Sequence, residues 1–160
     1  MNLRPARLQR VGKLTVVLLF AVTCCSESPT KSSLERRTLE DNRELFRQSV
    51  GTSYGYDFQN VCFCGPDTRA PVRIEVRDGQ FQSVVLREDG TAVARERWDQ
   101  YLTVEQVFAS IEDALDESAA SVRVAYDPSL GYPRDVFIDF NEMIADEELG
   151  FTVENLSAVR

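Results

Sequence analysis

The chain switches between two hydrophobic spacings, and each switch predicts a change of secondary structure. Apolar residues recur every three or four positions in residues 34–49 and again in 104–120, which predicts two amphipathic helices. Ser32 and Thr103 precede these stretches, each with Glu or Gln three residues later, as in the capping box of a helix N-terminus. We therefore expect the first helix to begin at Ser32 and the second at Thr103.

Between the helices the spacing changes to two, which predicts β-strands. Residues 52–64 are expected to form one strand, ended by Gly65 and Pro66. Its apolar face would carry Tyr54, Tyr56, Phe58, Cys62 and Cys64.

A hairpin is predicted next, because Asp78-Gly79 is a strong two-residue turn signal between alternating segments. Pairing through this turn sets Val76 opposite Phe81 and Val72 opposite Val85. Residues 91–100 show no clear period.

Period two returns after the second helix, in residues 122–126 and 136–140, and a last strand starts at Phe151. Asp127 and Gly131 predict the turn between the first two of these strands, since Asp accepts local backbone hydrogen bonds and Gly adopts positive φ. We predict an α+β fold in which two main helices pack on one face of an antiparallel sheet. The order of helix then strands occurs twice, which is consistent with two helix-plus-strands units.

The charge distribution separates the start of the chain from the rest. The formal net charge is -8, yet residues 1–23 contain four of the 18 basic residues and no acidic one, which leaves 14 basic and 26 acidic residues beyond them. A surface this acidic repels phosphate backbones, so no nucleic-acid partner is expected. The chain has no histidine, which excludes Ser-His-Asp and Cys-His catalysis and imidazole-based zinc sites.

The basic start leads into an uncharged, mostly apolar run at 14–23. Ten helical residues rise about 15 Å, roughly half the thickness of a bilayer core. Residues 1–23 are therefore interpreted as a signal peptide, with a buried N-terminal helix as the alternative.

Ala21-Val22-Thr23-Cys24 resembles the lipobox of bacterial lipoproteins, although Thr23 is unusual before the acylated cysteine. Cys24 is the predicted lipidation site and Cys25 the alternative. Neither cysteine is followed by Asp, which in a Gram-negative source implies an outer-membrane lipoprotein facing the periplasm. Ordinary cleavage and a secreted product are the alternative.

The predicted organisation has three parts. Residues 1–23 form the signal peptide, 24–33 the anchor and flexible tether, and 34–160 a single α+β domain.

Cys62 and Cys64 are the first candidate site. On a regular strand, Cα atoms two residues apart are about 6.5–7 Å apart, at or beyond the limit for a disulfide. A bond between them would need a kink, which Gly65-Pro66 can provide. The pair is interpreted as a structural disulfide or two buried thiols, with redox activity as the functional alternative.

No metal site and no cofactor are predicted. Asp139, Asn141 and Asp146 offer oxygen ligands for calcium, but they lack the regular spacing of a calcium loop. We interpret their segment as a solvated acidic loop.

Several motifs occur in the order of a known family over roughly residues 40–156. They are Tyr54-x-Tyr56-x-Phe58, Cys62-Phe63-Cys64, Val72-x-Ile74-x-Val76, Asp78-Gly79 and Gly131-Tyr132-Pro133. Together they resemble the domain-of-unknown-function family numbered 6174, found mostly in bacterial exported proteins and lipoproteins. The resemblance implies export and one folded domain, and it implies no activity.

We therefore expect a non-enzymatic, lipid-anchored cell-envelope protein that binds another envelope protein or a ligand. A thiol-disulfide redox protein using Cys62 and Cys64 is the alternative.

Overall fold

The computed structural model describes residues 30–141, 143 and 148–159. The predicted signal peptide and the candidate residues Cys24, Cys25 and Asp146 lie outside the described residues. The elements are α1 (Lys31–Ser49), β1 (Tyr54–Asn60), α2 (Pro66–Arg69), β2 (Val72–Arg77), β3 (Gln80–Leu86), the 3-10 helix η1 (Arg95–Gln100), α3 (Val104–Asp116), β4 (Ser121–Tyr126), β5 (Pro133–Asp139) and β6 (Glu148–Ala158).

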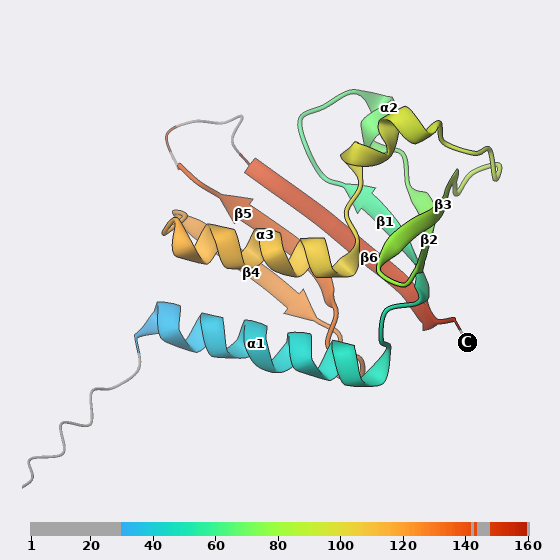
Figure 1. The fold of residues 1–160 in the computed structure, drawn as a ribbon. Helices are drawn as coiled ribbons and strands as arrows, with labels where there is room; N and C mark the ends of the chain where they lie inside the picture. Colours follow the sequence, from blue (N-terminus) through green and yellow to red (C-terminus); the bar gives the residue numbers. More distant parts are fainter. Residues whose placement is uncertain (1–29, 142, 144–147, 160) are drawn as a thin grey trace, which may run out of the picture.

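The strands form one antiparallel sheet in the order β3-β2-β1-β6-β5-β4, and α3 lies across β4 and β5 while α1 packs beside α3 (Figure 1). This confirms the predicted α+β class. Two units, α1 with β1 to β3 and α3 with β4 to β6, meet where β1 pairs with β6. The first unit places its first strand at this junction and the second its last strand, so the units differ in topology.

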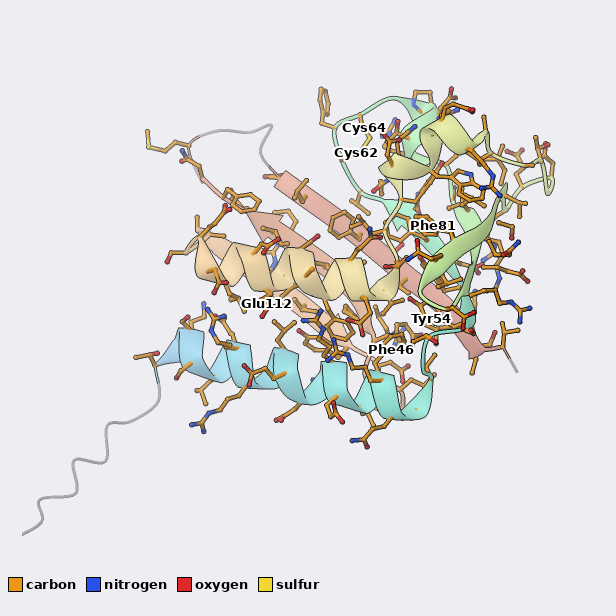
Figure 2. All side chains as sticks on the ribbon, in the orientation of Figure 1. Phe46, Tyr54, Cys62, Cys64, Phe81 and Glu112 are labelled. Atoms are coloured by element: carbon orange, nitrogen blue, oxygen red, sulfur yellow. A yellow bond between two sulfur atoms is a disulfide. The ribbon has the colours of Figure 1, made fainter. Side chains whose placement is uncertain are left out.

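Aromatic side chains fill the space between the helices and the sheet. Phe46 of α1 lies 5.3 Å from Tyr54 of β1 and 5.9 Å from Phe108 of α3, measured between ring centroids. Figure 2 shows Phe46 and Tyr54 where α1 meets the sheet. Burial raises the pKa of Tyr54 to about 12. The alternation in β1 therefore directs its aromatic residues into one core, as predicted.

The 3-10 helix η1 and Tyr101, which follows it, pack over another part of the same face of the sheet. Trp98 packs edge-on against Phe81 of β3 at 6.1 Å, and Tyr101 packs against Phe58 of β1 at 6.2 Å. The stretch without a clear period in the sequence therefore contains a 3-10 helix whose partly buried Trp98 packs against the core, and buried Tyr101 follows it directly.

Ion pairs join α1 to α3 on the outer side. Arg43 and Arg47 each donate from Nε to the Glu105 carboxylate at 2.9 Å, and Arg43 also contacts Glu112 at 3.0 Å. Partial burial opposes ionisation of Glu105, but hydrogen bonds and charge from the two arginines outweigh it and lower its pKa.

Each of the two main helices differs from its prediction at one end: α1 at its start and α3 at its last residue. Helix α1 begins at Lys31, because Thr30 is the N-cap and accepts from the Ser33 backbone N–H at 3.3 Å. The predicted start at Ser32 is wrong, and residues 31–33 of the predicted tether belong to the helix. Lys31 pairs with Glu35 across this first turn at 3.7 Å.

Helix α3 begins with the predicted capping box of Thr103 and Gln106. It ends at Asp116 instead of near residue 120, because Ser118 adopts a positive φ of 58°. Ala119 N–H then bonds back to the Ala114 carbonyl at 2.9 Å, which closes the helix end.

The β2–β3 hairpin starts in the predicted register, with Val76 opposite Phe81. A bulge then shifts the pairing, so that Val72 lies opposite Leu86 and the predicted pairing with Val85 is wrong. One extra β3 residue, Gln82, accounts for the shift.

The predicted turn between β4 and β5 is confirmed. The Asp127 carboxylate accepts from the backbone N–H groups of Ser129 and Leu130, both at 2.9 Å. Gly131 has φ +77°, and a Cβ there would lie 2.3 Å from the Asn42 carbonyl of α1. The turn therefore needs glycine both for its conformation and for close packing against α1.

The two edges of the sheet differ. The β3 edge is covered by residues 91–93, where Leu86 N–H donates to the Thr91 carbonyl at 2.8 Å and Val93 N–H to the Val84 carbonyl at 2.9 Å. Within the described residues, β4 pairs on one side alone, with β5. No described helix is long and apolar enough to cross a membrane.

Candidate functional site

Cys62 and Cys64 form a disulfide in a tight turn, with their Cα atoms 5.3 Å apart. Figure 2 places both next to α2 at one end of the molecule. The predicted extension of the first strand through Cys64 is wrong, because β1 ends at Asn60. Pro66 begins the short helix α2 beyond the turn.

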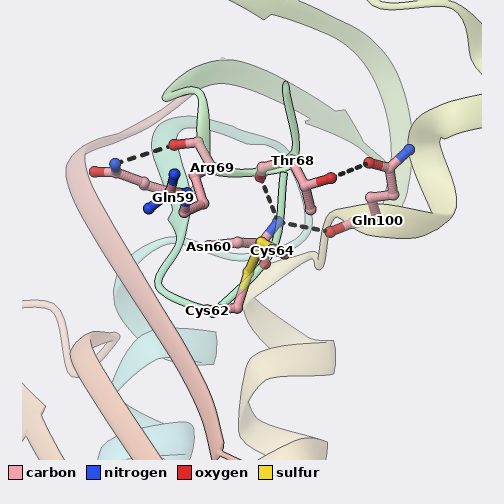
Figure 3. Close-up of a disulfide and its surroundings, with 7 residues drawn as sticks. All are labelled: Gln59, Asn60, Cys62, Cys64, Thr68, Arg69 and Gln100. Carbon is pink, nitrogen blue, oxygen red and sulfur yellow. Dashed lines mark hydrogen bonds between the residues drawn. A yellow bond between two sulfur atoms is a disulfide. The ribbon is translucent and has the colours of Figure 1, made fainter. Parts of the chain in front are cut away.

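Hydrogen bonds fix the base of this turn (Figure 3). Asn60 donates from Nδ2 to the carbonyls of Thr68 and Gln100, at 3.2 and 3.0 Å. Gln59 donates to the Arg69 carbonyl at 3.0 Å. The side chain of Asn60 therefore ties the end of β1 to both α2 and η1.

Phe63, between the two cysteines, is displayed to solvent. Its side chain is 99% exposed, and neighbouring Val61 is 53% exposed. The disulfide closes the turn, and the hydrogen bonds of Asn60 fix the backbone just before it. The backbone at Phe63 is therefore restricted while its side chain lies in solvent. An aromatic side chain this exposed has no role in the described core, so packing does not account for it.

A groove of about 600 Å³ lies beside Phe63, and we call it the Phe63 groove. It is lined by Val61, Cys62, Phe63, Cys64, Phe137, Glu148 and Leu149. Gly150, which pairs with Phe137, is buried, and its lack of a side chain lets Val61 pack closely over it. A Cβ on Gly150 would lie 2.9 Å from the Val61 Cβ and 2.7 Å from the Val61 carbonyl oxygen.

Two carboxylates give this end of the sheet a negative charge. Glu148 lines the groove and lies opposite Asp139 in the β5–β6 register. Among the described residues neither forms an ion pair. Like charges directly opposite each other on a sheet are unfavourable. Arg123 of β4 stacks over the Phe137 ring at 4.2 Å, so the local sum of these three charges is one negative.

The two calcium candidates inside the described residues accept backbone hydrogen bonds in turns. Asp139 accepts from the Asn141 backbone N–H at 2.9 Å, and Asn141 accepts from the Met143 N–H at 3.0 Å. The described residues contain no group of three or more His, Cys, Asp or Glu side chains placed to hold a metal ion.

Sequence reasoning missed a second charged cluster, on the face of the sheet opposite the helices. Asp57 of β1 is 8% exposed there and accepts from Arg73 at 3.3 Å and from Asn155 Nδ2 at 2.6 Å. Arg87 also pairs with this carboxylate. We call these four residues the Asp57 cluster.

A glycine makes room for the Asp57 cluster. A Cβ on Gly55 would lie 2.8 Å from Arg73 Nη2. Arg73 also donates to the Asn155 carbonyl at 3.0 Å, so the cluster links three strands. Because Asp57 neutralises one of the two arginines and is itself fully engaged, we interpret the cluster as structural. No local sequence pattern predicts the Asp57 cluster, because its four residues are far apart in the chain and become neighbours only when the strands pair.

No curated protein and no solved structure matches this chain. The described domain coincides with a family defined by sequence, which confirms the resemblance carried by the aromatic, cysteine and hairpin motifs. The chain belongs to the family of unknown function DUF6174, whose profile matches residues 38–158.

Proposed function

We propose that this chain is an exported, lipid-anchored binding module that contacts another envelope protein through Phe63 and the groove beside it. The observation that carries the proposal is the 99% exposure of Phe63 within a disulfide-closed turn. A large apolar side chain fixed in water costs solubility, and aromatic side chains are enriched at the centres of protein interfaces.

The position of the turn supports a protein partner over the membrane that would carry the anchor. The start of α1, where a tether would join, and the disulfide beside α2 lie at opposite corners of the molecule (Figures 1 and 2). A domain held at the start of α1 would therefore direct Phe63 away from its own membrane.

Site-specific photo-crosslinking in the native cells tests the proposal. Phe63 would be replaced by p-benzoylphenylalanine in the full chain, with Leu34 of α1 replaced in the same way as the control. Leu34 is also exposed and apolar, at 50%, but lies on the distant helix. We expect a discrete adduct from position 63 that is absent from position 34.

A folding control accompanies this test. Phe63→Ser should leave the thermal midpoint unchanged, because its side chain contributes almost no buried area. The variant should also compete poorly for the partner when co-expressed with the photo-reactive chain. No adduct, or equal adducts at positions 63 and 34, would refute the proposal.

Lipidation is a separate part of the proposal. Labelled palmitate should enter the wild-type chain and Cys25→Ala, and it should be lost in Cys24→Ala. Unchanged labelling of Cys24→Ala would remove Cys24 as the acylated residue.

Redox activity is the second candidate, because both cysteines are half-buried and line an open groove. It predicts that the disulfide opens and re-forms in millimolar glutathione, as measured by mass spectrometry after thiol trapping. A bond that stays closed throughout the titration would exclude this role.

A further inference from the structure

We infer that the outer edge of β4 binds an extended segment of another protein, which adds to the sheet as a further strand beneath α1. Three features of this edge support it: the backbone of β4 is unpaired on its outer side, an apolar groove lies beside it, and α1 forms the roof of that groove. The site is separate from the Phe63 groove, because α1 and β4 lie away from the disulfide end of the molecule (Figures 1 and 2).

The backbone of β4 offers hydrogen bonds on one side. Within the described residues β4 pairs with β5 alone, and no turn or loop bonds to the backbone of residues 121–126. In an antiparallel sheet every second residue directs both its N–H and its C=O away from a given neighbour. The six residues of β4 therefore present about three such outward pairs to an added strand.

A groove of about 460 Å³ runs beside this edge, and we call it the β4 groove. Three elements supply its apolar lining: Leu34 from α1, Ile111 and Leu115 from α3, and Val122, Val124 and Tyr126 from β4. An adjoining hollow of about 270 Å³ shares Leu115 and Val122 with the groove and reaches Ser121. The two spaces together therefore follow β4 from its first residue to its last.

The side chains of β4 that face the helices are incompletely covered. Val122, Val124 and Tyr126 pack against the core but are only half-buried, whereas Arg123 between them is exposed on the other face. Leu34, on the α1 side of the same groove, is 50% exposed. An added strand with apolar residues at alternate positions would bury these surfaces, which favours its binding.

The unpaired backbone favours a polypeptide over a lipid chain as the occupant. An acyl chain in the β4 groove would exclude water from the outward N–H and C=O groups without replacing their hydrogen bonds, which is unfavourable. An extended polypeptide bonds to these groups and places alternate side chains in the groove, which is the mode of β-strand addition.

Charge favours a different protein over a second copy of this chain. If two β4 strands paired antiparallel with Val124 opposite its counterpart, Arg123 of each copy would lie opposite Ala125 of the other. The two Arg123 side chains would then be diagonal neighbours on one face, and their like charges would repel. A partner strand with uncharged residues at these positions avoids this repulsion.

Nuclear magnetic resonance of the isotope-labelled full chain in lipid nanodiscs tests the inference with a defined probe. The probe is the peptide acetyl-Ser-Val-Thr-Val-Asn-Val-Ser-amide. Its control is the same peptide N-methylated at every backbone amide, which keeps the side chains but cannot donate backbone hydrogen bonds. We expect saturable shifts of the Val122 and Val124 amides with the probe and none with the control.

Two matched variants locate the binding site. Leu34→Glu places a charge in the β4 groove and should weaken peptide binding roughly tenfold, whereas Leu149→Glu, in the Phe63 groove, should leave binding unchanged. Both leucines are partly exposed, so both variants should fold as the wild type does.

Several results would overturn the inference. They are the absence of saturable shifts at Val122 and Val124, equal binding of the methylated peptide, and equal weakening by the two variants. Shifts with palmitate instead of the peptide would indicate a lipid site, and self-association through β4 that excludes the peptide would indicate a second copy. None of these measurements involves Phe63, and a partner at β4 would give an adduct at position 34 that differs in mass from the adduct at position 63.

Discussion

On the face of the sheet that α1 and α3 cover, aromatic rings pack against one another with little exposed surface. On the opposite face, charged side chains cover the middle of the sheet, and the Phe63 groove opens at one end. The covered face draws its stability from burial, which depends mainly on side-chain volume. The open face depends on a few positioned polar contacts, so a small chemical change there should matter more than a loss of volume.

The largest difference between the faces is expected from removing one aromatic ring on each. Phe108→Ala should lower the free energy of unfolding by about 3–5 kcal/mol, because Phe108 is completely buried among α1, α3 and the sheet. Phe137→Ala on the open face should cost less than about 1 kcal/mol. Urea denaturation measures both, and equal losses would contradict the comparison.

The next effect is expected from the centre of the open face. Asp57→Asn keeps the size of the side chain but leaves Arg73 and Arg87 without their carboxylate. We expect a loss of about 2 kcal/mol, below the value for a fully buried pair because both arginines are partly exposed. Asp135→Asn is the control on the same face. A similar loss of stability there would contradict a specific stabilising role for the Asp57 cluster.

Two buried tyrosines sharpen the description of the covered face. Tyr56 donates its hydroxyl to the Leu102 carbonyl, so Tyr56→Phe should cost about 1 kcal/mol. The Tyr101 hydroxyl is buried and has no hydrogen-bond partner among the described residues, so Tyr101→Phe should be neutral or slightly stabilising. Thermal denaturation of both variants tests this, and the reverse order would contradict the assigned hydrogen bonds.

The smallest effect belongs to the ion pairs outside the core. The pKa of Glu105 is lowered in the folded chain, so its ionised form stabilises the fold above the unfolded-state value near 4.5. This contribution should disappear as the pH falls through the lower folded-state pKa. Glu105→Gln should therefore cost about 1 kcal/mol or less at neutral pH, and this cost should shrink as the pH falls through the lowered folded-state pKa of Glu105. A difference from wild type that persists in acid would refute this assignment.

The covered face could be predicted from the sequence because its determinants are local. Alternation in β1 and the capping box at Thr103 depend on residues close together in the chain. Local signals also caused the errors. The period of two continues past Asn60, but the strand ends there and the chain turns through the Cys62–Cys64 disulfide.

The open face could not be predicted in this way. Asp57 and Asn155 are 98 residues apart and meet because a bulge in β6 directs Asn155 toward β1. The Phe63 groove likewise needs Val61, Phe137 and Glu148, which come from distant parts of the chain, to meet at one end of the sheet. The cysteine pair was identified from sequence, whereas the exposure of the phenylalanine between its members required the structure.

The unequal edges of the sheet also limit how copies of this protein can assemble. Residues 91–93 pair with the Val84–Leu86 end of β3, whereas β4 pairs on one side alone among the described residues. Among the described strands, β4 is therefore the outer strand whose backbone is open along its whole length to pairing with a second copy. The short segment beside β3 shortens the backbone edge that is available there for strand addition.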